Sequence, residues 1–143
     1  MTAGTSCSCI APEVIAAYRA ARYRVETAFD LAIDVPSSAL AGWQADRGVA
    51  CSALITACNP ASHAQSERRN QAANRQLQSE LSRRKLVFSQ TLALDPEDRW
   101  PDEPGFLIAG LAREAAAALG RRFGQNAIVW VGADAIPRLI LLR

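Results

Sequence analysis

The chain has 143 residues, of which 50% are hydrophobic and 21% are charged, and its formal net charge is +2. These values are typical of one globular domain; they exclude disordered and collagen-like chains, and the small net charge is weak support for a polyanionic partner. No apolar stretch approaches the ~20 residues that a membrane-spanning helix needs, and the first ten residues lack the pattern of a secretory signal. We therefore expect a flexible tail over residues 1–10, one domain over residues 11–143, and a cytoplasmic setting without membrane contact.

The first part of the chain predicts two helices and two strands. Proline at a first helical turn favours a helix over about Pro12–Arg22. Apolar and polar residues then alternate over Tyr23–Ile33, which predicts one half-exposed strand suited to antiparallel pairing. A short helix is expected at about Ser38–Arg47, with Trp43 on its buried side. Val49–Cys58 is apolar on both faces, so this strand should lie in the centre of the sheet.

A sharp Asn59-Pro60 break follows this strand, and a long polar helix follows the break. Either Ser62 or Ser66 can cap the helix, which should run to about Arg84, and Ser62-x-x-Gln65 fits a capping box. The remaining predicted elements are a strand at Val87–Leu94, an acidic loop at Asp95–Pro104, a strand at Phe106–Leu111, a helix at Arg113–Phe123 that Gly124 ends, and strands at Ala127–Val131 and Arg138–Leu142. This order predicts an α+β fold with a mixed, mainly antiparallel sheet of about five to six strands and about four packed helices.

The helix after the break has polar residues on a face that is expected to be buried. Leu77 and Leu81 define its buried side, and steps of three and four residues back from them reach Asn74, Asn70 and Ser66. A buried amide without a hydrogen-bond partner costs about 1–3 kcal/mol, so these side chains need partners. The candidate binding residues for a polar or anionic small ligand are Asn59, Ser62, Ser66, Asn70 and Asn74. The alternative is that they only tie down the turn between strand and helix.

Three more residues extend this candidate site. Glu103 stands beside Trp100 at the start of a predicted strand and is the carboxylate of the acidic loop that we keep as an acid/base candidate. Gln125 and Asn126 add amides to the same pocket if their turn lies near Asn59. The rest of the acidic loop does not have the ligand spacing of an EF-hand, and we expect it to be solvated, with Trp100 packed on the domain.

The sequence provides little support for a metal or cofactor, and we expect none. His63 is the only histidine, which excludes HExxH sites, and an exposed turn histidine is the simpler interpretation. Cys51 and Cys58 are expected to be small buried hydrophobes. Cys7 and Cys9 form one close pair without a second pair, which is a weak metal signal.

The basic residues of the segment 66–85 indicate a second possible class of function. Arg68, Arg75 and Arg83 recur on a roughly common side of the predicted helix and could contact phosphates, which would make the protein a non-catalytic module that binds nucleic acid or protein. A solvated helix face explains the same residues, because no nucleic-acid motif accompanies them. Whether the protein is an enzyme stays open, as does its oligomeric state.

Two motifs resemble a family of small bacterial proteins, the domain of unknown function 3293 family. They are Ile55-Thr-Ala-Cys-Asn-Pro60, with Ser62, Ser66, Asn70 and Leu77 following it, and Arg122-Phe-Gly-Gln-Asn-Ala-Ile-Val-Trp130. The likeness extends from about Tyr18 to Leu142 and includes Tyr18-Arg-Ala-x-Arg22-Tyr23 and Trp100-Pro-x-Glu-Pro104. Two positions depart from the family pattern: Cys58, where an aromatic residue is expected, and Gly105, where serine is expected. The resemblance implies a stand-alone cytosolic bacterial domain and brings no catalytic residues with it.

Overall fold

The computed structural model describes residues 9–143, and this range forms four α-helices, one short 3-10 helix and seven strands. In chain order the elements are α1 (Pro12–Ala20), β1 (Arg22–Val25), β2 (Phe29–Leu31), α2 (Ser38–Asp46), β3 (Ser52–Ile55), η1 (Pro60–Ser62), α3 (Glu67–Arg83), β4 (Phe88–Leu94), β5 (Glu103–Ala109), α4 (Arg113–Arg122), β6 (Ala127–Val131) and β7 (Pro137–Leu141). The α+β class is confirmed. Among the described residues, no helix is long and apolar enough to cross a membrane.

The strands form one sheet in the order β2-β1-β4-β5-β3-β6-β7. Every strand pair within it is antiparallel, so the predicted mixture of directions is not present in the described residues. The apolar strand β3 lies between β5 and β6, and all four of its residues are buried. Its predicted central position is therefore confirmed.

The sheet has seven strands rather than five or six, because the predicted strand Tyr23–Ile33 is a hairpin. Its chain turns at Glu26, which has a φ of 52°, and β1 then pairs with β2 so that Val25 faces Phe29. The loop between these two residues has three residues, so odd-numbered side chains stay on the same side of the sheet after the turn. The alternation therefore continues through a turn that lacks glycine and proline, and periodicity alone could not reveal it.

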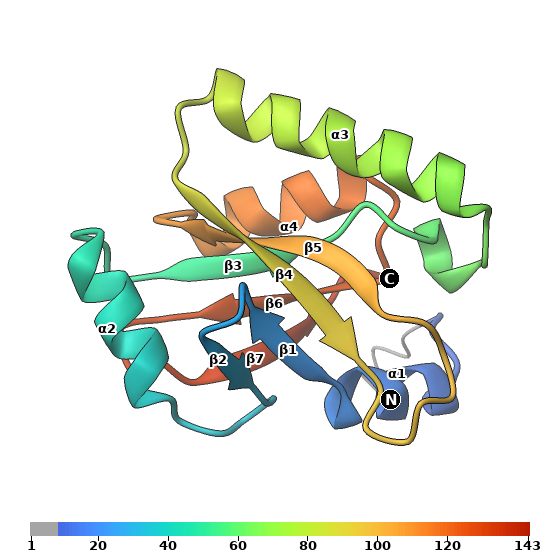
Figure 1. Ribbon diagram of the computed structural model, residues 1–143, viewed down its shortest axis with the longest axis horizontal. Coiled ribbons are helices and arrows are strands. Elements are labelled where there is room, and N and C mark those ends of the chain that lie inside the picture. The colour runs from blue at the N-terminus through green and yellow to red at the C-terminus, as the bar shows by residue number, and fades with distance from the viewer. Residues whose placement is uncertain (1–8) are drawn as a thin grey trace, which may run out of the picture.

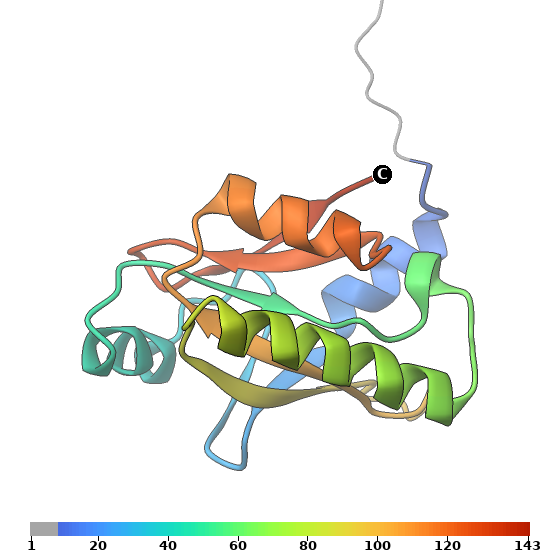
Figure 2. The same cartoon turned by 90° about the horizontal axis from the view of Figure 1, so that it is seen from above.

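The sheet curls, and its two faces have separate cores. On one face, α3 and α4 lie side by side over the sheet, and they pack Leu77 and Leu81 of α3 against β3 and β5 (Figures 1 and 2). On the other face, the curl brings the chain after β2 to the start of β7, where the Asp34 amide donates to the Pro137 carbonyl at 2.7 Å. We call this second face the inner face of the sheet.

The helices α1 and α2 lie at opposite ends of the inner face (Figure 1). At one end, α2 inserts Leu40 and Trp43 into the inner core, and the Trp43 indole donates to the Ser89 hydroxyl at 3.1 Å. At the other end, none of the residues of α1 is buried. The break after β3 and the acidic loop lie at this same end, so the structure brings the sequence features of interest together there (Figure 1).

The first described residues are Cys9 and Ile10. Cys9 is exposed and Ile10 is 7% exposed, which places Ile10 in the protein interior. Residues 1–8 of the predicted tail, and with them Cys7 of the predicted Cys7–Cys9 pair, lie outside the described part.

The contact between α4 and the sheet requires a glycine at position 120. A Cβ at Gly120 would lie 2.7 Å from both the Ile128 Cγ2 and the Leu142 Cδ1 atoms. We predict that Gly120→Ala lowers the free energy of unfolding, because overpacking costs about 1–3 kcal/mol while the better helix preference of alanine returns at most about 1 kcal/mol. Denaturant unfolding measures this change.

Gly42→Ala is the matched control, since Gly42 lies in α2 with no atom near its missing Cβ. This variant should gain about 0.5–1 kcal/mol from helix propensity alone. Equal stability of the two variants would contradict the close contact at Gly120.

Candidate functional site: a cavity at one end of the curled sheet

The break after β3 holds three residues in the left-handed region of φ. Asn59, Ala61 and Ser62 have φ values of 46°, 56° and 62°. Such conformations cost about 1–3 kcal/mol each in residues other than glycine, so surrounding contacts must hold them. One contact is the Ala61 amide, which donates to the Gly124 carbonyl at 2.7 Å. Gly124 has a φ of 72°, and a Cβ there would lie 3.0 Å from the Pro60 Cβ, so glycine is required where this turn meets the break.

Asn59 and Asn70 exchange hydrogen bonds across the break. The backbone amide of Asn59 donates to Asn70 Oδ1 at 2.9 Å, and the side-chain Nδ2 of Asn70 donates to Asn59 Oδ1 at 3.0 Å. Gln65 joins both: its Nε2 donates to Asn70 Oδ1 at 2.8 Å and its backbone amide donates to Asn59 Oδ1 at 3.1 Å. Both polar atoms of the Asn70 side chain therefore bond within the protein, which is the geometry of a scaffold.

Ser66, not Ser62, is the cap of α3. Its hydroxyl accepts from the Arg69 amide at 3.2 Å, and α3 begins at the next residue, Glu67. The predicted Ser62–Gln65 capping box does not form, because the left-handed residues place Ser62 in η1 and the Gln65 amide bonds to Asn59 instead. Ser66 does not line the cavity described below.

Asn74 and Gln125 bond to the backbone around Cys58. Asn74 Oδ1 accepts from the Ala57 amide at 2.9 Å, and its Nδ2 donates to the Pro104 carbonyl at 3.0 Å. Gln125 Nε2 donates to the Cys58 carbonyl at 3.1 Å. Both side chains are buried, so these bonds satisfy polar groups that water cannot reach.

A second polar group connects α1 to the break. The hydroxyls of Tyr18 and Ser62 are hydrogen-bonded to each other. Asn126 Nδ2 donates to both, at 3.3 Å to Tyr18 and 3.1 Å to Ser62. Asn126 therefore lies near the break, but its amide positions α1 and does not line the cavity.

Glu103 connects the amides of the break to the inner face of the sheet. Asn59 Nδ2 donates to Glu103 Oε2 at 3.0 Å. Burial raises the pKa of Glu103, and the hydrogen bond from Asn59, which favours the ionised form, offsets this only in part. Tyr23 of β1 and Glu103 of β5 both lie opposite Ala93 of β4, so the two side chains share a row on the same face. The pKa of Tyr23 is raised, first by burial and then by the charge of Glu103.

These groups surround a cavity of about 930 Å³ between α1, the first half of α3 and the inner face of the sheet. Its size is typical of small-molecule sites. Six of the eight predicted site residues line it: Asn59, Ser62, Asn70, Asn74, Glu103 and Gln125. Apolar walls complete it, and they include Val14 and Ala17 of α1, Leu54 of β3, Val129 of β6, Leu139 of β7 and Trp100 of the acidic loop.

Thr91 lines the cavity from β4 and has an unpaired hydroxyl. The residue is 4% exposed, and its Oγ1 atom has no hydrogen-bond partner among the described residues. The facing residue is Gly105, where a Cβ would lie 3.2 Å from Thr91 Oγ1 and 3.0 Å from the Ile55 carbonyl. Neighbouring atoms therefore approach position 105 so closely that any side chain there would crowd the Thr91 hydroxyl.

The cavity residues that were not predicted from the sequence include Tyr18, Tyr23 and Thr91. Tyr18 and Tyr23 read as ordinary apolar positions of a helix and a strand. Thr91 could have been found, because polar residues on the buried side of a strand are visible in the sequence. The buried side of β4 holds Ser89 and Thr91, and only Ser89 has a hydrogen-bond partner, the Trp43 indole.

The acidic loop and the histidine have structural explanations. Asp95 is buried, and its carboxylate accepts from the backbone amides of Glu97 and Arg99 at 3.0 and 2.8 Å and pairs with the Arg99 guanidinium. Trp100 packs against the inner core, as predicted. His63 is exposed, as predicted. Among the described residues, no three His, Cys, Asp or Glu side chains are grouped to hold a metal ion.

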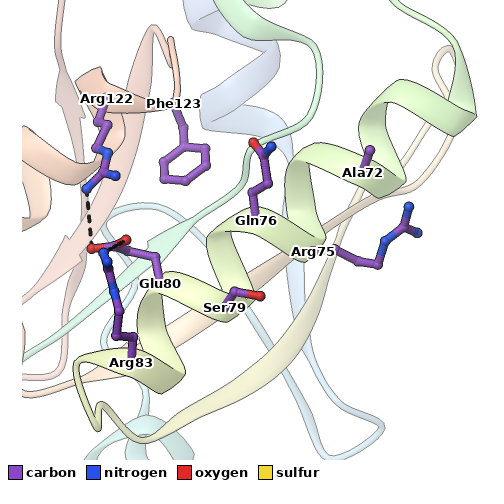
Figure 3. A pocket seen from close by; sticks show the side chains of 8 residues that line it. All are labelled: Ala72, Arg75, Gln76, Ser79, Glu80, Arg83, Arg122 and Phe123. Carbon is purple, nitrogen blue, oxygen red and sulfur yellow. Dashed lines mark hydrogen bonds and ion pairs between the residues drawn. The ribbon is translucent and has the colours of Figure 1, made fainter.

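A second hollow lies between α3 and α4 and is an open groove of about 850 Å³ (Figure 3). Its floor is Glu80, which is 7% exposed and pairs with Arg83, with Arg84 at 2.7 Å and with Arg122 at 3.3 Å. These pairs lower the pKa of Glu80, with the Arg84 hydrogen bond as the largest cause. Figure 3 shows the Arg75 side chain pointing away from Glu80. Of these pairs, the one with Arg122 joins α4 to α3, while Arg83 and Arg84 stand at the end of the same helix as Glu80.

Asn70 tests the scaffold geometry. We predict that Asn70→Ala lowers the free energy of unfolding by about 1–3 kcal/mol, because the Asn59 amide loses its acceptor in a half-buried position. Thermal and denaturant unfolding measure this loss. The neighbouring Gln71 is exposed and bonds only to the exposed Glu67 at 3.4 Å, so Gln71→Ala should change stability by less than about 0.5 kcal/mol. An Asn70→Ala variant as stable as Gln71→Ala would contradict the scaffold role.

Glu103 makes stability depend on pH. Its pKa is higher in the folded chain, so the folded state binds more protons than the unfolded state between the ordinary glutamate value, about 4.3, and the raised value. The free energy of unfolding contributed by this residue therefore falls as the pH rises through that window. We predict that Glu103→Gln is more stable than the native chain at about pH 7 and that the difference disappears below about pH 4. Denaturant unfolding measures the free energy of unfolding of both proteins at each pH. A difference between them that stays constant with pH would contradict the raised pKa of Glu103.

Comparisons with known proteins identify the family. The model of the family described as "Protein of unknown function (DUF3293)" matches residues 55–128, which is just over half of the chain. Comparisons with curated proteins and with solved structures gave no significant match. The matched range starts in β3 and ends in β6, so it contains the break, α3 and Glu103, but not Tyr18 or Tyr23. On this match, the chain belongs to the DUF3293 family.

Proposed function

We propose that this protein binds a polar small molecule in the cavity between α1, α3 and the inner face of the sheet. The observation that carries the proposal is Thr91, a buried hydroxyl without a partner among the described residues, in the wall of a cavity that also holds the half-buried carboxyl of Glu103. A buried polar group without a partner costs about 1–3 kcal/mol, and a ligand that bonds to it recovers this cost. The proposal includes the predicted cytoplasmic setting and names no reaction.

The geometry divides the predicted site residues into two roles. Asn59, Asn70 and Asn74 bond to the protein and fix the shape of the cavity. Glu103 and Thr91 have bonding capacity left for a ligand, since Asn59 occupies only one carboxylate oxygen of Glu103. The predicted anionic ligand is disfavoured, because an ionised Glu103 in the wall would repel it.

The alternative, an interaction module that uses the basic segment 66–85, has weaker support. Arg83 and Arg84 both pair with Glu80, so part of the positive charge of this segment is neutralised within the protein. Lys85 and Arg75 stay at the surface. If the protein shifts the gel mobility of random DNA or RNA, and added salt abolishes the shift, this alternative would be favoured.

A thermal-shift screen of metabolites and nucleotides tests the proposed function. A ligand present at 100 times its dissociation constant adds about 2.7 kcal/mol of stability, which gives a clear rise in the melting temperature. We expect hits among polar compounds of a size that fits the cavity.

The hits are then repeated with Gly105→Val, which crowds the Thr91 hydroxyl with a side chain, and with Gly42→Ala, which lies in α2 and does not line the cavity. Binding should be lost in the first variant and kept in the second. Hits that bind both variants equally, or a screen without hits in the native chain, would refute the proposed site.

A further inference from the structure

The charges around the cavity are unbalanced. Four acidic residues line it, and three of them, Glu13, Glu67 and Asp102, are exposed at its mouth. The fourth, Glu103, is half-buried inside. Arg75 is the single basic residue among the lining residues, and it is exposed on α3. A cleft lined by one sign of charge concentrates ligands of the opposite sign, so this mouth favours cations.

Glu103 has no cationic partner among the described residues. None of their ion pairs includes it, and its hydrogen-bond donor is the neutral amide of Asn59. Removing a carboxylate from water without a counter-charge is costly, which is why burial raises the pKa of this carboxyl. A bound cation would supply the missing charge and favour the ionised form.

Thr91 lies at the right place to share the same ligand group. It pairs with Gly105 across β4 and β5, and Glu103 is two residues before Gly105 on the same face. Diagonal neighbours of this kind lie about 7–8 Å apart, with their Cβ atoms somewhat closer, so one hydrogen-bonding group can contact both the carboxylate and the hydroxyl. An ammonium group has three donors and can bond to both oxygens.

The rest of the cavity suits an apolar body. Leu54, Val129 and Leu139 form its wall on the sheet, while the aromatic rings of Tyr18 and Trp100 come from α1 and the acidic loop. Aromatic rings also attract cations through their faces. A strongly hydrated inorganic ion would leave these surfaces unused.

We propose that the ligand class is an organic amine with an apolar body, whose ammonium group bonds between Glu103 and Thr91. This inference rests on the proposed function and specifies its ligand. The apolar body lies against the inner face of the sheet under α1, and the carboxylates at the mouth raise the local concentration of the amine.

Three probes with a shared apolar body test the inference: 2-phenylethylamine, 2-phenylethanol and phenylacetate. Calorimetric titration into the full chain should give the amine as the tightest ligand. Its affinity should rise with pH as Glu103 ionises, up to the pH at which the amine itself loses its proton. The affinity of the alcohol should not rise with pH.

Two variants locate the ammonium group. Glu103→Gln should weaken the amine roughly 30-fold or more, which corresponds to the lower end of the cost of removing one member of a buried charge pair. Thr91→Val should weaken it roughly 2- to 10-fold, the worth of one hydrogen bond, without loss of stability, since the variant removes an unpaired buried hydroxyl. Glu97→Gln is the control, because the Glu97 side chain is 71% exposed and does not line the cavity.

The outcomes separate this inference from the proposed function. If the alcohol or phenylacetate binds in a Thr91-dependent way and the amine does not, the amine class is overturned and the proposed cavity site stands. Amine binding that Glu103→Gln leaves unchanged would also overturn the inference. If none of the probes binds, the inference fails, and the broader screen with Gly105→Val decides the proposed function by itself.

Discussion

The inner face of a curled sheet is apolar and must be covered at both ends of the curl, and this protein covers the two ends differently. At one end, Leu40 and Trp43 of α2 reach the core and fill it. At the other end, α1 presents only partly buried side chains, and a cavity lies beneath it. Curled and closed sheets commonly hold ligands where side chains do not fill their interior. The candidate site therefore lies at the end of the curl where the covering helix, α1, has no buried residue.

The amides at the break have a structural role, and the ligand-facing groups have a binding role. Asn59 and Asn70 hold strained backbone in place by bonding to each other, and Asn59 also fixes the carboxyl of Glu103. Buried polar networks of this kind resist deformation when all their members have partners, and they are costly when one partner is missing. Thr91 lies beside this network without a partner among the described residues, so its hydroxyl and the second oxygen of Glu103 are the groups that a ligand can bond to.

The sequence predicted the elements with strong patterns and the residues with unusual placement. The central strand β3, the long helix α3 and the polar residues Asn59 and Asn70 are confirmed as structural features, because apolar runs and polar residues on a buried face are visible in one dimension. The hairpin of β1 and β2 was missed, since its three-residue loop keeps the alternation in phase. Thr91 was missed because its meaning depends on pairing across strands, with Gly105 opposite and Glu103 diagonal to it, and register cannot be read from a single segment.

The helix α1 differs from the other helices in how it is held. Its polar attachments are the side-chain group of Tyr18, Ser62 and Asn126, a hydrogen bond from the Tyr23 hydroxyl to the Tyr18 carbonyl and an exposed Arg19–Asp34 ion pair, and none of its residues is buried. Segments with few buried apolar contacts open locally at a far lower free energy than the whole domain unfolds. Opening of α1 therefore leaves the sheet and the packed helices α3 and α4 in place. Exchange between the cavity and solvent is consequently a local event, whose rate depends on a few hydrogen bonds at one end of the molecule and not on its global stability.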